Sequence, residues 1–211
     1  MICLVDNDII DKLAMCNLLD ETLAALDSSR TDAYVLPTAK YKFGVAGRKH
    51  GTGEQQYGAE VFARIRGFLG SVREIDVAGP SEEIRLLASI DGIDAGEAIL
   101  FSATAEFAQY LLATSDKTSL RALASSPLCL PIAQRIHGHV ICLEQIVKRL
   151  IQHFGFFYVR DKIVPVRACD TALTAAFGSG WEATETNVLA ALDSYIDELR
   201  SLPIDLPAHL D

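Results

Sequence analysis

Four acidic residues stand where their side chains can meet and do chemistry. Asp6 and Asp116 each follow a short apolar run, while Asp94 and Glu97 lie three residues apart at the expected start of a helix. Clustered carboxylates repel one another, which raises their pKa values. A hard divalent cation such as Mg²⁺ or Mn²⁺ relieves that repulsion and prefers oxygen ligands. Water bound to the cation can then attack a phosphodiester.

A simpler interpretation needs no metal. Aspartates at strand ends often cap the helices that follow, because the first turn of a helix carries unpaired N–H groups and a partial positive charge. Spacing alone favours capping for Asp6 and Asp116, and both interpretations stay open at this point.

The apolar runs predict the elements that must position these acids. Strands are expected at 2–5, 33–36, 73–77, 110–113 and 140–143, and helices at 8–19, 61–69, 82–87, 94–108 and 144–153. Strands that alternate with helices favour a three-layer α/β/α sandwich with a central, mainly parallel sheet. Ligands of such sheets gather beyond the carboxyl ends of the strands, where Asp6 and Asp116 are expected.

The last sixty residues show a different pattern. We expect residues 1–150 to form the α/β domain and residues 151–211 an α-rich C-terminal extension packed on it. The runs 156–160 and 162–166 flank Asp161 and predict a hairpin, and a long amphipathic helix is expected at 182–202. Its apolar face either covers the domain's own core or binds a partner, so a homodimer stays open.

Composition excludes several classes of protein. The chain has 211 residues, of which 50% are hydrophobic, so it can build a sizeable core. No apolar stretch approaches the ~20 residues that a membrane helix needs, and the acidic start does not resemble a secretory signal. The five cysteines show no metal-binding or disulfide spacing. We therefore expect a cytoplasmic protein with no membrane contact and with reduced cysteines.

Charge is uneven along the chain. The formal net charge is −9, which excludes a general nucleic-acid coat. Residues 40–73 go against this trend, with seven Lys and Arg residues against two Glu residues. The glycine-rich centre of this segment, 44–53, is expected to be a mobile loop that either tracks phosphates or is solvated without a ligand.

Three short motifs in order resemble the PIN domain, a family of metal-dependent nucleases found in toxin–antitoxin ribonucleases and RNA-processing enzymes. They are Leu4-Val5-Asp6-Asn7-Asp8, Ile93-Asp94-Ala95-Gly96-Glu97-Ala98 and Leu112-Ala113-Thr114-Ser115-Asp116-Lys117. The resemblance covers roughly residues 1–150, and the last sixty residues resemble no family that we can name.

The resemblance implies a function and a site. It implies hydrolysis of RNA phosphodiester bonds by Mg²⁺ or Mn²⁺ bound to Asp6, Asp94, Glu97 and Asp116. The basic residues that would contact the nucleic acid are Lys42, Arg48, Lys49 and Lys117. The implied partners are RNA and, as in toxin–antitoxin systems, an antitoxin or other protein.

The chain departs from the family pattern at one position. The family usually has a further acid after the second strand, but residues 37–43 contain none and Lys42 stands there. Glu60 or Glu83 could replace the acid, or Lys42 could hold a phosphate directly. Alternatively, Lys42 pairs with Asp6 in place of the cation, which would leave a catalytically inactive module that binds nucleic acid or protein.

Overall fold

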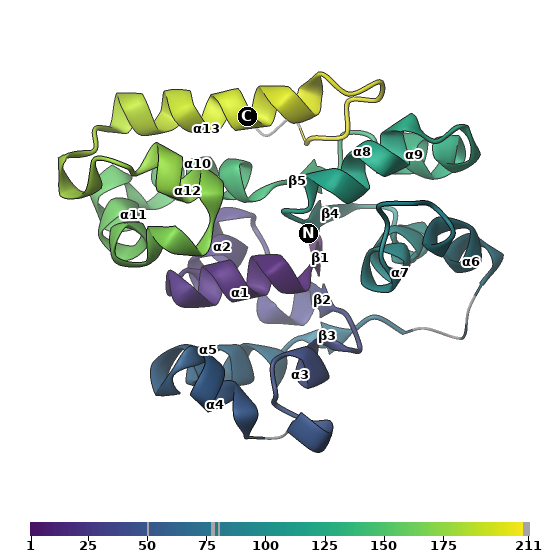
Figure 1. Ribbon diagram of the computed structural model, residues 1–211, viewed down its shortest axis with the longest axis horizontal. Helices are drawn as coiled ribbons and strands as arrows, with labels where there is room; N and C mark the ends of the chain where they lie inside the picture. The colour runs from purple at the N-terminus through teal and green to yellow at the C-terminus, as the bar shows by residue number, and fades with distance from the viewer. Residues whose placement is uncertain (50, 77–78, 80, 209–211) are drawn as a thin grey trace.

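The computed structural model describes residues 1–49, 51–76, 79 and 81–208, and these contain a five-stranded parallel sheet of order β3-β2-β1-β4-β5 (Figure 1). The strands are β1 (Ile2–Val5), β2 (Ala33–Val35), β3 (Arg73–Glu74), β4 (Tyr110–Ala113) and β5 (Val140–Ile141). The chain begins with the central strand, β1, and then adds β2 and β3 on one side of it. It returns to the centre to add β4 and β5 on the other side. β1 and β4 are parallel neighbours, so their carboxyl ends lie side by side, and the direction in which the chain adds strands reverses between them.

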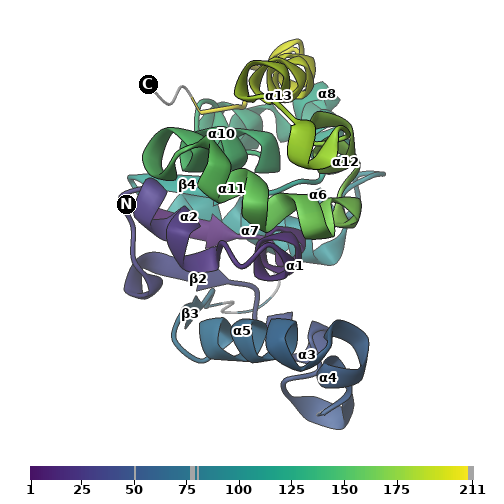
Figure 2. The same ribbon diagram turned by 90° about the vertical axis from the view of Figure 1, so that its left-hand side faces the viewer.

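Helices cover both faces of the sheet (Figures 1 and 2). One face carries α1 (Asn7–Met15), α2 (Leu19–Ala25), α5 (Ala59–Leu69) and α10 (Leu143–Phe154). The other face carries α6 (Glu82–Ala88), α7 (Ala95–Ala103), α8 (Lys117–Ser125) and α9 (Leu130–Ile136). This arrangement confirms the predicted three-layer α/β/α sandwich.

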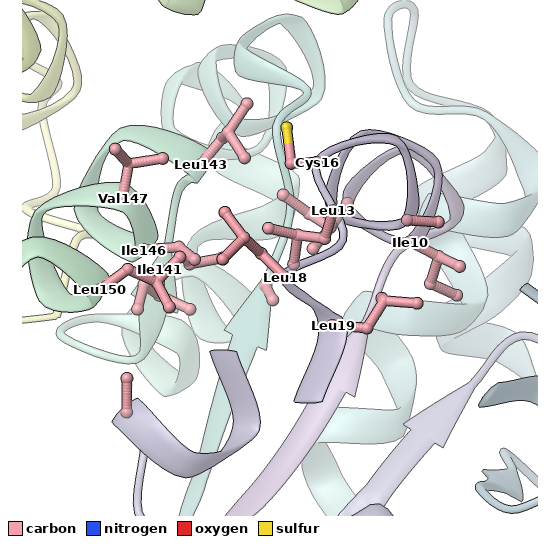
Figure 3. Close-up of a cluster of buried hydrophobic side chains, with 14 of the residues drawn as sticks. Ile10, Leu13, Cys16, Leu18, Leu19, Ile141, Leu143, Ile146, Val147 and Leu150 are labelled. Atoms are coloured by element: carbon pink, nitrogen blue, oxygen red, sulfur yellow. The ribbon is translucent and has the colours of Figure 1, made fainter. Parts of the chain in front are cut away.

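Each face of the sheet has its own buried core, because successive residues of a strand point to opposite sides. Figure 3 shows part of the core on the α1 side, with Leu13 of α1 and Ile146 and Leu150 of α10 among its side chains. In β4, Leu111 belongs to this core and Leu112 to the core under α7 and α8. The strands are therefore apolar on both sides and appear in the sequence as short continuous runs of apolar residues.

The predicted hairpin after residue 155 is wrong. The structure has α11 (Phe156–Ile163) there, followed by a 3-10 helix over Val164–Cys169. Phe156, Val159 and Ile163 are buried, and their spacing is that of one helical face rather than of alternating strand residues. The run of aromatic and β-branched residues gave the strand prediction, but packing against the sheet-covering helices selects the helix.

The extension continues with α12 (Thr171–Ala176), a 3-10 helix over Gly180–Glu182 and α13 (Glu185–Arg200). In α13, Val188 and Leu192 belong to one buried core while Ile196 and Leu199 belong to the other. The predicted boundary at residue 150 falls inside α10. The apolar face of α13 therefore covers the protein's own cores, which was one of the two expected roles.

The end of the described chain returns to the sheet. The N–H of Val140 donates to the carbonyl of Leu206 at 3.1 Å, and Val140 forms a parallel bridge with Pro207. The side-chain amide of Gln145 also donates to the carbonyl of Ala208 at 2.8 Å. The extension thus covers the outer edge of β5, as Figure 1 shows for α13 above it.

The basic segment 40–73 is more structured than expected. Its elements are α3 (Ala39–Lys42), a 3-10 helix over Gly47–Lys49, α4 (Thr52–Tyr57) and α5. The glycines serve close packing: a Cβ at Gly53 would lie 2.3 Å from the carbonyl oxygen of Phe43. The region expected to be a mobile loop therefore folds against a buried phenylalanine, and only residue 50 in it lies outside the described residues.

Some element boundaries also differ from the sequence predictions. The third strand was expected at 73–77, but β3 covers Arg73–Glu74, and residue 77 is outside the described part of the chain. The remaining 3-10 helices are Arg30–Asp32, Thr104–Glu106 and Pro127–Cys129. No helix among the described residues is long and apolar enough to span a lipid bilayer.

Candidate functional site

Asp6 lies where β1 ends and α1 begins, next to the end of β4. Its main-chain N–H donates to the carbonyl of Ala113 at 2.9 Å, which continues the ladder between the two strands. Its carboxylate caps α1 by accepting the N–H of Asn7 at 2.6 Å. The residue is only 9% exposed. Burial, followed by the negative charge of Asp8, raises the pKa of Asp6 to about 6.

Thr114 connects Asp6 to Asp116, which follows β4. The buried hydroxyl of Thr114 donates to Oδ2 of Asp6 across 3.4 Å and accepts the main-chain N–H of Asp116 at 3.2 Å. Oδ1 of Asp116 in turn accepts the N–H groups of Thr118 and Ser119 at 2.8 and 3.0 Å, which caps α8. One hydroxyl group therefore stands between the two aspartates at the same edge of the sheet.

Asp94 and Glu97 reach this edge from the first turn of α7. They cap the helix reciprocally, because Asp94 Oδ1 accepts the N–H of Glu97 at 2.8 Å and Glu97 Oε2 accepts the N–H of Asp94 at 2.7 Å. Gly96 lets this turn approach the end of β2, since a Cβ there would lie 3.0 Å from Cδ1 of Leu36. Glycine thus allows the acidic turn to sit over the carboxyl end of the sheet.

Glu97 is a buried acid that interacts with the charge of Asp116. Its pKa is raised to about 7, mainly by burial and further by the negative charges of Asp116 and Asp94. The N–H of Asp94 and the hydroxyl of Ser119 act in the opposite direction. Glu97, like Asp6, is thus a carboxyl whose ionised form the surrounding protein stabilises poorly, and a nearby cation would reverse that.

The four predicted acids share one edge of the sheet but do not converge on one point. Among the described residues, no three Asp, Glu, His or Cys side chains are grouped so that they could hold a metal ion. Asp6 and Asp116 each cap a helix, as the capping interpretation predicts, and Asp94 caps α7 as well. Their oxygens are nevertheless the donors that Mg²⁺ and Mn²⁺ prefer. The donor chemistry fits such an ion, while joint coordination requires these side chains to shift toward one another.

Lys42, which stands where the resemblance implies a further acid, forms its ion pair with Asp8. Nζ of Lys42 lies 3.0 Å from Oδ1 of Asp8, and the lysine side chain is 44% exposed. Its charge also reaches Asp6, where it partly offsets the pKa increase that burial and Asp8 cause. Within the described chain, Lys42 therefore does not take the cation's place on Asp6, and its ammonium group remains accessible to a phosphate.

The two suggested replacements for the missing acid lie in other ion pairs. Glu60 is on α5 and pairs with Arg64 at 3.3 Å. Glu83 is on α6 and pairs with Arg135 at 2.5 Å. The same arginine donates to the carbonyl of Phe101 in the last turns of α7, so Glu83 is at the far end of that helix from Asp94. Neither glutamate reaches the candidate site.

Asp8 and Asp11 are two acids near the site that the sequence analysis did not select. They are three residues apart on α1, and both charges act on Tyr57, whose pKa burial raises first. Oδ1 of Asp11 is buried and accepts no hydrogen bond from the described residues. The spacing of Asp8 and Asp11 directly after Asp6 is the sequence signal that could have found them, because residues three apart share a helix face.

The predicted nucleic-acid contacts fall into two groups. Arg48 is exposed in the segment between α3 and α4, near Lys42, and the side chain of Lys49 lies outside the described part of the structure. Lys117 has a different environment. Its ammonium group pairs with Glu144 at 3.0 Å and with Glu198 at 3.7 Å, and the side chain is 17% exposed. Because these acids pair with its charge, we do not propose a phosphate contact for Lys117.

Comparison of the chain with protein-family models, with curated proteins and with solved structures finds no match.

Proposed function

We propose that this chain is a PIN-like, metal-dependent nuclease that hydrolyses RNA phosphodiester bonds with Mg²⁺ or Mn²⁺. One observation carries the proposal: Asp6 and Asp116 lie on either side of the Thr114 hydroxyl where the building direction of the sheet reverses. Parallel α/β sheets bind their ligands at this switch point, beyond the carboxyl ends of the strands. Buried acids with raised pKa values at such a place are typical of functional sites.

The residues have distinct roles in this proposal. Asp6 and Asp116 would hold the cation, and Asp94 and Glu97 would complete its oxygen ligands from α7. A bound Mg²⁺ or Mn²⁺ supplies a nucleophilic water at neutral pH and stabilises charge on the phosphate. Thr114 fixes the Asp6 carboxylate by donating to it across 3.4 Å. Capping bonds such as that from Asn7 to Asp6, at 2.6 Å, keep the carboxylates at the carboxyl ends of the strands, from which they still have to shift toward one another to bind a cation jointly.

The test is cleavage of single-stranded RNA in Mn²⁺ by the wild type and by Asp116→Asn. Asparagine keeps the oxygen that caps α8 but loses the negative charge, so the helix is preserved and the cation site is not. Asp32→Asn is the matched control, because Asp32 caps the turn before β2, at the opposite edge of the sheet. We expect Asp32→Asn to cleave like the wild type and Asp116→Asn to lose cleavage. Equal cleavage by Asp116→Asn and the wild type would refute the assignment.

A second candidate, a PIN-like binding module without catalysis, is favoured by a different observation. The aspartates already serve as helix caps, and no three acidic, His or Cys side chains within the described chain are grouped for a metal. This candidate predicts negligible affinity for Mg²⁺ or Mn²⁺. Titration calorimetry separates the two functions, since tight Mn²⁺ binding that Asp6→Asn removes counts against the inactive module.

A further inference from the structure

An open cavity of 410 Å³ lies beside the candidate site, and the proposed metal chemistry does not use it. Its lining residues are Thr38, Tyr41, Lys42, Ala46 and Arg48. Pockets for small ligands measure roughly 300–1,000 Å³, so a nucleotide fits by size. Lys42 lines the cavity and also lies next to the candidate site, because its Nζ is 3.0 Å from Oδ1 of Asp8 and its charge acts on Asp6.

Tyr41 presents an aromatic ring at this cavity, with 59% of the residue exposed. The main chain of Gly47 braces the ring. A Cβ at Gly47 would lie 2.7 Å from Cδ1 of Tyr41 and 3.0 Å from Cε1, and its φ of +75° is also one that favours glycine. The ring is therefore supported by the backbone while most of its surface stays open to a ligand.

The segment that carries Tyr41 is held in place from within. The N–H groups of Val45 and Ala46 both donate to the carbonyl of Lys40, at 2.8 and 3.0 Å. Phe43 is fully buried and its ring contacts that of Tyr57. Because the segment that carries Tyr41 is already ordered by these contacts, a ligand that stacks on Tyr41 does not have to order it first. Figure 1 shows α3 and α4 together beyond the β3 side of the sheet.

The charges at the cavity are complementary to a phosphate. Arg48 is exposed and forms no ion pair with the residues that the structure describes, and Lys42 is partly exposed beside it. Among the described residues, no acidic side chain lines the cavity. An open aromatic ring flanked by two cations is the combination that binds single-stranded nucleic acids, since the ring stacks on a base and the cations follow the backbone.

We propose that Tyr41, Lys42 and Arg48 form a subsite for one unpaired nucleotide of single-stranded RNA. The base stacks on Tyr41, and the flanking phosphates contact Lys42 and Arg48. Lys42 then places the next phosphodiester toward Asp6. A paired base cannot offer its face to a side chain, so the subsite selects single strands over duplexes. The identity of the ligand as RNA rests on the proposed nuclease function.

The test measures binding while EDTA prevents cleavage. Fluorescence anisotropy follows a labelled single-stranded RNA of mixed sequence with the wild type, Tyr41→Ala and Tyr41→Phe. Loss of stacking should weaken the affinity of Tyr41→Ala about tenfold, while Tyr41→Phe keeps the ring and the affinity. Phe157→Ala is the matched control, because it removes a ring of a residue that is 68% exposed on α11, and it should bind like the wild type.

Two further measurements sharpen the result. A duplex RNA of the same sequence should bind more weakly and should not respond to Tyr41→Ala. Arg48→Gln should reduce the slope of log affinity against log salt concentration by about one, the effect of one lost phosphate contact. The proposal is overturned if the wild type binds no single-stranded RNA, if Tyr41→Ala binds it normally, or if Phe157→Ala loses as much affinity.

These outcomes can be told apart from a failure of the nuclease proposal. If Asp116→Asn cleaves as well as the wild type, the metal assignment fails whatever Tyr41→Ala does in the binding assay. If Asp116→Asn loses cleavage while Tyr41→Ala binds RNA normally, the subsite alone is refuted. Because Tyr41 is exposed, its replacement should leave the melting temperature near that of the wild type, which thermal unfolding checks.

Discussion

Thr114 places its hydroxyl 3.4 Å from Oδ2 of Asp6, and the contact joins the ends of two strands that are far apart in sequence. The pairing of Val5 with Ala113 fixes this contact, because it sets the next residue of each strand opposite the other. The same hydroxyl accepts the N–H of Asp116. A single buried side chain thus contacts the carboxylate of Asp6 and the main chain of Asp116, the two aspartates that the proposed function requires.

Thr114→Val tests whether this hydroxyl matters. Valine has nearly the same shape, but it removes the Thr114 donor to Oδ2 of Asp6, whose Oδ1 keeps the N–H of Asn7, and it leaves the N–H of Asp116 without an acceptor. We expect a loss of stability of about 1–3 kcal/mol, the cost of leaving buried polar groups unpaired. RNA cleavage should fall further than this loss of stability explains, and Thr114→Ser should restore both. Urea unfolding and a cleavage assay measure the two effects.

The control for Thr114→Val is Thr22→Val. Thr22 is also buried, and its hydroxyl finds no hydrogen-bond partner in the described part of the structure. Removing it should be neutral or stabilising and should leave cleavage unchanged. If Thr114→Val behaves like Thr22→Val in both assays, the hydroxyl does not orient the site.

The raised pKa values of the buried acids predict how stability depends on pH. The pKa of Asp6 is about 6 in the folded protein against an ordinary 3.8, and that of Glu97 is about 7 against 4.5. Between each pair of values the folded chain binds more protons than the unfolded chain. In EDTA, these two groups should therefore make stability fall as the pH rises from about 4 to about 7.

Asp6→Asn should remove the Asp6 part of this dependence while keeping the cap on α1. At about 1.4 kcal/mol per pKa unit, the free energy of unfolding of the variant should exceed that of the wild type by at most about 3 kcal/mol above pH 7. This gain in stability should vanish near pH 4. Thermal unfolding across this pH range measures it. An Asp6→Asn protein that is less stable than the wild type at pH 8 contradicts the burial argument.

Lys42→Gln tests the conclusion that Lys42 is accessible to a phosphate and does not occupy the cation's place. Because Lys42 pairs with Asp8 rather than Asp6, its removal should raise Mn²⁺ affinity only by a few fold, as expected for a partly exposed charge. Binding of single-stranded RNA should weaken, since a phosphate contact is lost. A rise in Mn²⁺ affinity of about 100-fold would be far larger than the loss of one exposed ion pair can cause. It would mean that Lys42 occupies the cation's place.

Leu192→Ala tests whether α13 is part of the core. Leu192 is fully buried, so truncation should cost about 2–5 kcal/mol, the range for buried leucines. Leu128→Ala is the comparison, because Leu128 is 65% exposed, and it should change stability by less than about 0.5 kcal/mol. Equal unfolding midpoints for the two variants would show that the apolar face of α13 is available to a partner instead.

The layered fold could be predicted because both faces of the sheet are buried. A strand such as β1 is then a short apolar run with an acid at its end, and the run alternates with helical patterns along the chain. The hairpin prediction at Phe156 failed for a related reason. Consecutive aromatic and β-branched residues look like a strand, and only the long-range packing of α11 shows which of them are buried.

The strand-end acids could also be placed from the sequence, because a parallel sheet brings its carboxyl ends to one edge. The partners of the basic residues could not. Lys42 pairs with Asp8 on α1, and Lys117 pairs with Glu144 on α10 and Glu198 on α13. These contacts join segments far apart in the chain, and local spacing carries no information about them.

A crystal soaked in Mn²⁺ tests the central claim most directly, because anomalous scattering locates the ion independently of any assay. The account predicts an anomalous peak between Asp6 and Asp116, with Glu97 or Asp94 among the ligands, and no such peak in a crystal of Asp116→Asn. A wild-type crystal soaked in the same way that shows no peak at this end of the sheet would contradict it.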